Sequence, residues 1–211
     1  MKVKEVFYTV QGEGYHSGRP AVFCRFTGCN LWSGREEDRT SAECKFCDTD
    51  FLGGDNYTEN GLVQKIVDTW NGSSELDDYA NNVFYKQSPF VVFTGGEPGL
   101  QLTSTLIQKL RNRNFNCSVE TNGTVELPKG VYWITVSPKW GTKLKQTSGH
   151  ELKVVWPQPF NLAKLERLDF RHRYLQPMDG VDGSVQQTLE QVLSRPSWKL
   201  SLQTHKILGV R

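Results

Sequence analysis

The sequence lacks the features of a membrane-spanning, secreted or nucleic-acid-binding protein. No apolar run approaches the roughly 20 residues that span a bilayer, and Met1–Phe7 contains no apolar stretch of the kind found in a secretion signal. The formal net charge is only +2, and there is no basic cluster with interleaved aromatic residues to indicate nucleic-acid binding. We therefore expect a cytoplasmic protein whose ligands are small molecules.

The sequence also has no linker, internal repeat or low-complexity segment that would separate domains. Its 211 residues, 37% of them apolar, are typical of one soluble domain. A chain of this length buries about 70% of the surface that its unfolded form exposes. We predict a single domain, residues 1–211.

The five cysteines are an odd number, which favours metal binding over a disulfide framework in a chain without a secretion signal. Two residues separate Cys44 from Cys47, so one loop can direct both thiolates at one site, and fourteen residues separate Cys29 from Cys44. The local sequence holds no fourth ligand. Two interpretations stay open here: a structural zinc ion completed by Cys24, Cys117 or a distant His, or an iron–sulfur cluster whose three thiolates leave one iron open for chemistry.

Two glycine-rich turns follow predicted strands. Val3–Val10 alternates enough for a strand and ends in Gln11–Gly14, which is either a ligand-binding loop or a plain turn. Phe90–Thr94 is a short buried strand that leads into Gly95–Gly99 and then into a helix. No Walker-type Lys-Ser/Thr pair follows these glycines, which argues against a nucleoside-triphosphate loop.

Apolar patterns predict further helices and strands. The helices are Thr58–Trp70, one with Leu102, Leu106, Ile107 and Leu110 on its apolar face, and one that a capping box opens at Ser184, with Val185, Leu189, Val192 and Leu193 on its apolar face. The strands are Pro20–Gly28, Cys117–Thr121, Tyr132–Ser137, Glu151–Trp156, Tyr174–Gln176 and Trp198–Thr204, and residues 73–89 are predicted to be irregular. Several strands end in a polar residue or Pro, and a parallel barrel builds its site at those ends.

Strand periodicity separates two neighbouring residues. Within Pro20–Gly28, Cys24 and Arg25 fall on opposite faces. Cys24 is then a small core residue, and Cys117 is interpreted in the same way. Arg25 lies inside an apolar strand only four residues before Cys29, where its guanidinium requires an anionic partner.

The three-Cys loop with an aromatic residue before its last Cys, together with Gly95-Gly96-Glu97-Pro98, resembles the radical S-adenosylmethionine (SAM) superfamily. Further motifs narrow the resemblance to the 7-carboxy-7-deazaguanine synthase family. They are Gln11–Gly14, Cys29–Trp32, Cys47–Thr49, Glu120–Gly123, Ser137–Lys139, Leu175–Gly180 and Gln203–Lys206. The superfamily usually places three residues between its first two cysteines, so residues 29–47 form an enlarged cluster-binding loop, of a kind that some members of this family carry.

The resemblance implies an α/β fold, a partial and shortened (β/α) barrel of the radical SAM type. It also implies a lyase that uses a 4Fe–4S cluster, SAM and Mg²⁺. In this family a radical generated from SAM takes a hydrogen atom from 6-carboxy-5,6,7,8-tetrahydropterin, the ring contracts, ammonia leaves, and 7-carboxy-7-deazaguanine is released for pathways such as queuosine biosynthesis. The implied partners are a reducing protein such as flavodoxin and a second copy of the chain in a homodimer.

The resemblance also implies roles for individual residues. The cluster ligands are Cys29, Cys44 and Cys47, and the Mg²⁺ contact is Thr49. The SAM site is formed by Phe46, Gly96, Ser137, Pro138, Lys139, Tyr174, Leu175, Gln176 and Pro177. The substrate contacts are Val10, Gln11, Gly12, Glu13, Arg25, Thr94, His205 and the carboxylate of the last residue, Arg211.

Two rival functions remain at this point. One is an activating enzyme that takes a glycyl hydrogen from a partner protein, because such enzymes share the cluster and the Gly-Gly-Glu-Pro motif. A dedicated pterin loop at residues 10–13 argues against it. The other is a non-enzymatic zinc-binding module, which would be colourless when purified, whereas an iron–sulfur protein would be brown.

Overall fold

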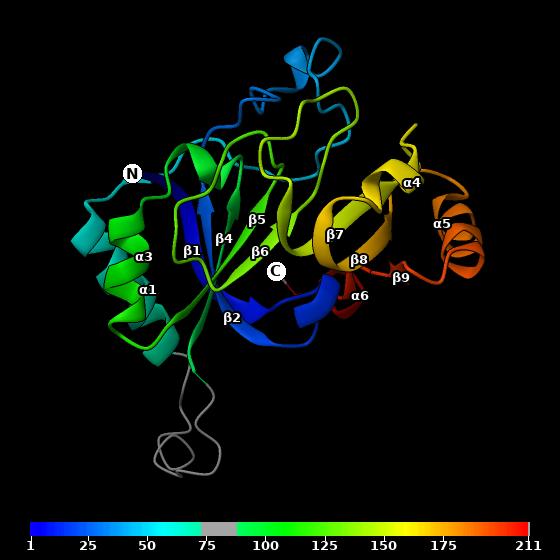
Figure 1. Cartoon of the computed structure of the whole chain (residues 1–211). Helices are drawn as coiled ribbons and strands as arrows, with labels where there is room; N and C mark the ends of the chain where they lie inside the picture. Colours follow the sequence, from blue (N-terminus) through cyan, green and yellow to red (C-terminus); the bar gives the residue numbers. More distant parts are fainter. Residues whose placement is uncertain (73–87, 211) are drawn as a thin grey trace.

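The computed structural model describes residues 1–72 and 88–210. Within these residues the chain forms a mixed α/β fold around a nine-stranded sheet of order β3-β1-β2-β4-β5-β6-β7-β8-β9 (Figure 1). The strands are β1 Lys2–Val10, β2 Pro20–Phe26, β3 Asp55–Asn56, β4 Phe90–Gly95, β5 Asn116–Thr121, β6 Trp133–Val136, β7 Ser148–Trp156, β8 Asp169–Pro177 and β9 Lys199–Leu200.

The sheet is mostly parallel. β1 pairs antiparallel with β2 and β3, and every pairing from β2 through β4 to β9 is parallel. The strand order is linear and ends at β3 and β9, so the described strands form an open sheet and not a closed barrel. The C-terminal ends of the parallel strands therefore meet along one edge, where sheets of this class bind ligands.

The chain also forms helices, and all but the last of them cover the outer face of the sheet. They are α1 Glu59–Asn71, α3 Ser104–Arg111, α4 Leu162–Leu165, α5 Ser184–Ser194 and α6 Thr204–Leu208, with single 3₁₀ turns η1 Gly14–His16, η2 Glu36–Asp38 and η3 Pro98–Leu100. The helix predicted for Thr58–Trp70 is confirmed, since Thr58 caps α1 by accepting a hydrogen bond from Gly61 N at 3.1 Å. None of the helices in the described parts of the chain is long and apolar enough to span a membrane.

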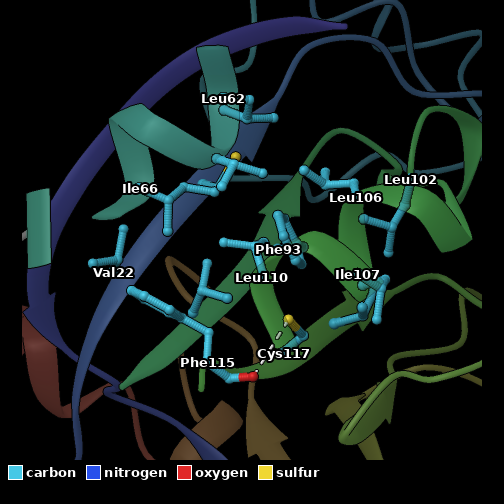
Figure 2. Close-up of a cluster of buried hydrophobic side chains, with 14 of the residues drawn as sticks. Val22, Leu62, Ile66, Phe93, Leu102, Leu106, Ile107, Leu110, Phe115 and Cys117 are labelled. Carbon is cyan, nitrogen blue, oxygen red and sulfur yellow. Dashed lines mark hydrogen bonds between the residues drawn. The ribbon is translucent and has the colours of Figure 1, made fainter. Parts of the chain in front are cut away.

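Two apolar clusters hold these helices against the sheet. The larger one joins α1 and α3 to β2, β4 and β5 through side chains such as Leu62, Ile66, Phe93 and Leu110 (Figure 2). The second lies under α4 and α5 and includes Trp198. Burial of such side chains is worth roughly 1.5–3 kcal/mol each, so the apolar side of the sheet anchors the fold.

Strand alternation leaves the opposite face of the sheet free for polar groups. On β2, Cys24 belongs to the larger cluster whereas Arg25 lines a pocket on the inner face, as the sequence predicts. On β7, Leu152 packs in the second cluster and Lys153 lines the same pocket. Cys117 is fully buried in the larger cluster, which confirms it as a core thiol.

The helix predicted from Ser184 forms as α5, but most of its predicted apolar face points outward, and of its four residues only Val192 packs against the second cluster. Val185 and Leu193 are 59% and 74% exposed, whereas Ser184 and Thr188 are buried. Both buried hydroxyls donate to backbone carbonyls, at 2.8 and 2.6 Å, so they need no water. The predicted capping box is absent, because the cap residue is Gly183 in the left-handed region with φ 75°.

The strand predicted for Trp198–Thr204 is wrong beyond Leu200. β9 ends at Leu200, and α6 begins at Thr204. The backbone N–H and the hydroxyl of Thr204 both donate to the carbonyl of Gly12, at 3.0 and 2.9 Å, which directs the chain off the sheet and toward the loop after β1. The irregular stretch predicted for residues 73–89 lies, as far as residue 87, outside the described residues.

Candidate active site

A pocket of about 610 Å³ opens at the C-terminal ends of the parallel strands. Its wall includes the ends of β4, β5 and β8, the loops after β1 and β6, the cluster loop and the segment before α6. In Figure 1 the loop that carries η2 lies at the top of the molecule, near the loop after β6, and Lys139 of the latter loop contacts the ring of Phe46 with its ammonium 5.7 Å from the ring centre. Segments far apart in the sequence therefore enclose one volume.

Three thiols line this pocket, Cys29, Cys44 and Cys47. A hydrogen bond from Cys44 lowers the pKa of the Cys47 thiol to about 6, with burial opposing this and the Thr49 backbone adding to it. A thiolate is the form that binds metal, so the lowered pKa of Cys47 favours the form that can act as a ligand.

The geometry disfavours the zinc interpretation. Among the described residues, no three His, Cys, Asp or Glu side chains converge on one point as the ligands of a single zinc ion do. Cys24 and Cys117 are fully buried in the apolar cluster and cannot serve as a fourth ligand. In an iron–sulfur cluster each cysteine binds its own iron, so three thiols that line one pocket fit that donor set.

Arg39 connects different parts of the enlarged cluster loop through its side chain. Its Nη1 donates to the carbonyls of Lys45 and Cys47 at 3.1 and 3.0 Å, and its guanidinium lies 4.1 Å from the centre of the Trp32 ring. Its Nε pairs with Glu36 at 2.6 Å. A single side chain thus joins the inserted residues to the backbone of the Cys44–Cys47 turn.

The Gly95–Gly99 turn brings backbone to the pocket wall. A Cβ at Gly96 would lie 1.9 Å from the carbonyl oxygen of Gly28, so only glycine fits there. Glu97 points away into the fold, where its carboxylate accepts hydrogen bonds from Thr121 Oγ1 and Asn122 N, both at 2.7 Å. Gly96 therefore faces the pocket, and Glu97 fixes the turn to the end of β5.

The floor of the pocket is a buried ion-pair network around Lys153, whose side chain is only 5% exposed. Lys153 Nζ donates to Glu13 Oε2, and to Glu120 Oε2 at 2.9 Å. Gln11 Nε2 donates to the other oxygen of Glu120 at 3.1 Å. Burial alone would lower the pKa of Lys153, but Glu120 and Glu13 raise it above its ordinary value, so Lys153 is charged.

Glu13 is bound on both of its oxygens. Besides Lys153, it accepts hydrogen bonds at Oε1 from Gln176 Nε2 and Gln203 Nε2, at 3.1 and 2.9 Å. Burial raises the pKa of Glu13, but Lys153 and Gln203 outweigh it and lower the pKa below its ordinary value. The carboxylate is therefore ionised inside the protein.

Helix α6 connects the loop after β1 to the cluster loop. Lys206 Nζ pairs with Asp48 at 2.6 Å and with Asp179 at 2.7 Å. His205 lies directly against Gly12, where a Cβ would come within 2.1 Å of the ring. Glycine at this position is thus required by the close approach of the histidine.

Arg25 has a protein partner that the sequence did not reveal. Its Nε donates to Glu5 Oε1 at 2.9 Å across the β1–β2 pair. The expectation that the Arg25 guanidinium has an anionic partner is therefore confirmed, with Glu5 in that place. Both side chains line the pocket, about one fifth exposed, so the guanidinium still faces the space where a ligand would lie.

No family model matches the sequence. Curated relatives do, along the whole chain. The sequence is 48% identical to the 7-carboxy-7-deazaguanine synthases of Bradyrhizobium diazoefficiens and Caulobacter vibrioides, with 99% of this chain and 98% of each relative covered. It is 46% identical to that of Nitratidesulfovibrio vulgaris over the same shares. The chain belongs to the 7-carboxy-7-deazaguanine synthase family.

A solved structure supports the fold of this family member. The crystal structure of QueE from Escherichia coli has a TM-score of 0.65 to this chain, with 24% identity, 96% of this chain and 93% of that chain covered. At this identity the likeness concerns the fold, a mixed α/β arrangement with a mostly parallel sheet.

Most residues that the family resemblance implies face the pocket. Those that line it are Val10, Gln11, Gly12, Glu13, Arg25, Cys29, Cys44, Phe46, Cys47, Thr49, Thr94, Gly96, Ser137, Lys139, Gln176, Pro177 and His205. Pro138, Tyr174 and Leu175 are buried and do not line it. Leu175 belongs to the second apolar cluster. Arg211 lies outside the described residues.

Other pocket residues were given no individual role from the sequence. They include Glu5, Asp48, Glu120, Asn122, Lys153, Asp179, Gln203 and Lys206. All of these but Glu5 and Lys153 lie in the motifs of the family resemblance. One signal was present: Lys153 interrupts the apolar run of Glu151–Trp156, just as Arg25 interrupts its own strand. A buried cation needs anionic partners, so the same argument would have placed Lys153 at the site.

Proposed function

We propose that this chain is a radical SAM carbon–nitrogen lyase that converts 6-carboxy-5,6,7,8-tetrahydropterin to 7-carboxy-7-deazaguanine with loss of ammonia, for queuosine biosynthesis. The observation that carries the proposal is 46–48% identity to several 7-carboxy-7-deazaguanine synthases over 99% of the chain. The pocket supports it, because three thiols and a polar floor share one volume.

The cofactor side of the pocket is assigned to the cluster loop and the strand ends. Cys29, Cys44 and Cys47 would hold a 4Fe–4S cluster with one iron left for SAM, as three thiolates without a fourth allow. Bound together, cluster and SAM supply the radical that takes a hydrogen atom from the substrate. The SAM contacts would be Phe46, Gly96, Ser137–Lys139 and Tyr174–Pro177, the buried members of the last two segments acting through their backbone or as support.

The substrate side is assigned to the residues around Glu13. The ionised carboxylate of Glu13 suits the amidine edge of a pterin, which presents N–H donors. The guanidinium of Arg25 suits the carboxylate of the substrate, because the two groups match in geometry and charge. Val10, Gln11, Gly12, Thr94, His205 and the terminal carboxylate of Arg211 would complete these contacts.

Further parts of the proposal concern the surroundings of the site. Thr49 would contact Mg²⁺ through its hydroxyl, a hard oxygen ligand of the kind that Mg²⁺ prefers. Residues 1–211 would act as one domain whose open sheet curves as a partial, shortened barrel around the pocket. We propose that the protein works as a homodimer in the cytoplasm and receives electrons from a reducing protein such as flavodoxin.

The test is a turnover assay under anaerobic conditions. Purified protein with reconstituted iron and sulfide is incubated with SAM, a reductant and the pterin, and the products are separated by mass. We expect 7-carboxy-7-deazaguanine and ammonia in equal amounts, from a brown protein that contains iron. SAM cleavage without conversion of the pterin would favour an activating enzyme, and a colourless zinc protein would overturn the proposal.

A further inference from the structure

Lys153 is a buried cation in the pocket that the proposed chemistry does not yet use. It projects from the middle of β7 between two carboxylates that come from distant segments, Glu13 after β1 and Glu120 at the end of β5. All three side chains line the pocket. An ammonium held by two carboxylates keeps its proton and is not a nucleophile, so its role must lie in what it does to them.

Every group that forms a hydrogen bond with one of the two carboxylates acts as the donor. Glu120 accepts from Lys153 and from the amide of Gln11. Glu13 accepts from Lys153 and from the amides of Gln176 and Gln203. A protonated carboxyl would have to donate one bond, so this arrangement fits two ionised carboxylates.

Two ionised carboxylates in one buried site repel each other. Without a cation between them, one of the pair takes up a proton near neutral pH, as buried carboxylates do when they share a site. A protonated carboxyl would offer a donor where the N–H groups of a reduced pterin need an acceptor.

We propose that Lys153 is a positioning residue that keeps Glu13 and Glu120 ionised and in fixed places, so that the pocket presents two acceptor groups to the N–H edges of the pterin. This proposal rests on the proposed function for the identity of the ligand. Lys153 itself need not touch the substrate.

The test compares Lys153→Met with the native enzyme and with Lys109→Met. Methionine keeps much of the length of the lysine and removes its charge. Lys109 pairs with Glu59 at 3.1 Å on the outer helices, away from the pocket, so Lys109→Met controls for the loss of a lysine ion pair elsewhere. Each holoenzyme is titrated anaerobically with the pterin and separately with SAM, from pH 6 to 9.5.

In Lys153→Met we expect the pterin Kd to rise with falling pH. Because the protonated form of the pair binds the pterin poorly, we expect the Kd at pH 7 to be about tenfold above its value at high pH. The native enzyme and Lys109→Met should show a smaller dependence, limited to Glu151, a third buried carboxyl on β7 whose pKa burial and the nearby Glu120 raise to about 7. SAM affinity should not change. A loss that is equal at every pH, an equal loss for SAM, or no loss at all would overturn the positioning role.

A measurement made in the absence of substrate tests this proposal independently of the proposed function. Carbon-13 NMR of glutamate carboxyls in the apo-protein should show one more resonance titrating near neutrality in Lys153→Met than in the native protein. Glu120→Gln in the Met background should remove the pair repulsion and with it that resonance. No added titration in Lys153→Met would refute the proposal, whether or not the native enzyme converts the pterin.

The double variant Lys153→Met/Glu120→Gln keeps the proposal testable if Lys153→Met alone does not fold. In Lys153→Met/Glu120→Gln the pair of carboxylates that Lys153 bridges is reduced to Glu13 alone, as it is in Glu120→Gln. If relieving the repulsion between Glu13 and Glu120 were the only role of Lys153, the double variant would bind the pterin as tightly as Glu120→Gln. We expect weaker binding than Glu120→Gln, because Glu13 has lost the group that fixes it.

Discussion

The cluster loop and the floor of the pocket are built in opposite ways. In the loop, Arg39 contacts Glu36, Lys45 and Cys47, which lie three to eight residues away in sequence. In the floor, Glu13 contacts Lys153 and Gln203, which are 140 and 190 residues away. The loop can therefore be recognised in a linear motif, whereas the floor exists only when β1, β5, β7 and the segment before α6 are assembled.

The largest effect that would test this division is the loss of the cluster. Replacing Cys29, Cys44 or Cys47 with Ala should abolish cluster assembly and turnover, because each thiolate holds its own iron. Cys24→Ala and Cys117→Ala remove buried core atoms and should lower the unfolding temperature while iron content stays the same. Iron analysis and thermal unfolding measure both; iron loss in Cys24→Ala or Cys117→Ala would contradict the three-ligand assignment.

A second test changes the substrate side without touching the loop. Arg25→Lys keeps the charge but loses the two-pronged donor geometry, and losing one such contact costs on the order of 2 kcal/mol. That corresponds to roughly a thirtyfold drop in kcat/KM for the pterin, with SAM affinity unchanged.

The ion pair with Glu5 supplies the control for Arg25→Lys. Glu5→Gln removes the charge partner of Arg25 on β1 but leaves the guanidinium in the pocket. If Arg25 binds the substrate carboxylate, Glu5→Gln should affect the pterin KM much less than Arg25→Lys does. Equal losses in the two variants would show that Arg25 serves the β1–β2 pair and not the ligand.

The same division explains how much could be predicted from the sequence. Cys29, Cys44 and Cys47 were predicted from spacing, and α1 from its apolar period and its Thr58 cap, because these are local signals. The outward face of α5 was not predictable, since the buried hydroxyls of Ser184 and Thr188 find backbone partners only in the folded chain.

The long-range part of the site was hidden for the same reason. Lys153 resembles an isolated polar residue in a strand until the fold brings Glu13 and Glu120 to it. The turn into α6 at Thr204 depends on the carbonyl of Gly12, 192 residues away, and no period in the sequence reports such a contact. The prediction of a partial barrel likewise came from the family resemblance and not from any local pattern.

A third, smaller effect concerns the residue where the loop meets the substrate side. Thr49→Val is nearly isosteric but lacks the hydroxyl, so it should lose most of any stimulation of turnover by Mg²⁺. Iron content should not change, because the thiols are intact. Rates measured across a Mg²⁺ series check this, and equal stimulation in both proteins would remove Thr49 from the metal site.

The smallest expected effect tests whether the loop is held by its own residues. Arg39→Met removes the donor to the carbonyls of Lys45 and Cys47 and the contact with Trp32. The Cys44–Cys47 turn should then open more often, and local opening exposes buried groups to reagents. In apo-protein we expect alkylation of these thiols to become about threefold faster, since contacts of an arginine that solvent reaches in part are weak.

Arg35→Met is the matched control for this prediction. Arg35 lies in the same loop and pairs only loosely with Glu37, at 3.7 Å, with both side chains mostly exposed. Within the described parts of the chain its side chain forms no hydrogen bond or ion pair with the cysteine turn, so alkylation should keep the native rate. Pterin affinity should be native in both variants, because the floor is held by Lys153 and Gln203 and not by the loop. Faster alkylation in Arg35→Met, or weaker pterin binding in Arg39→Met, would show that the two regions are not built independently.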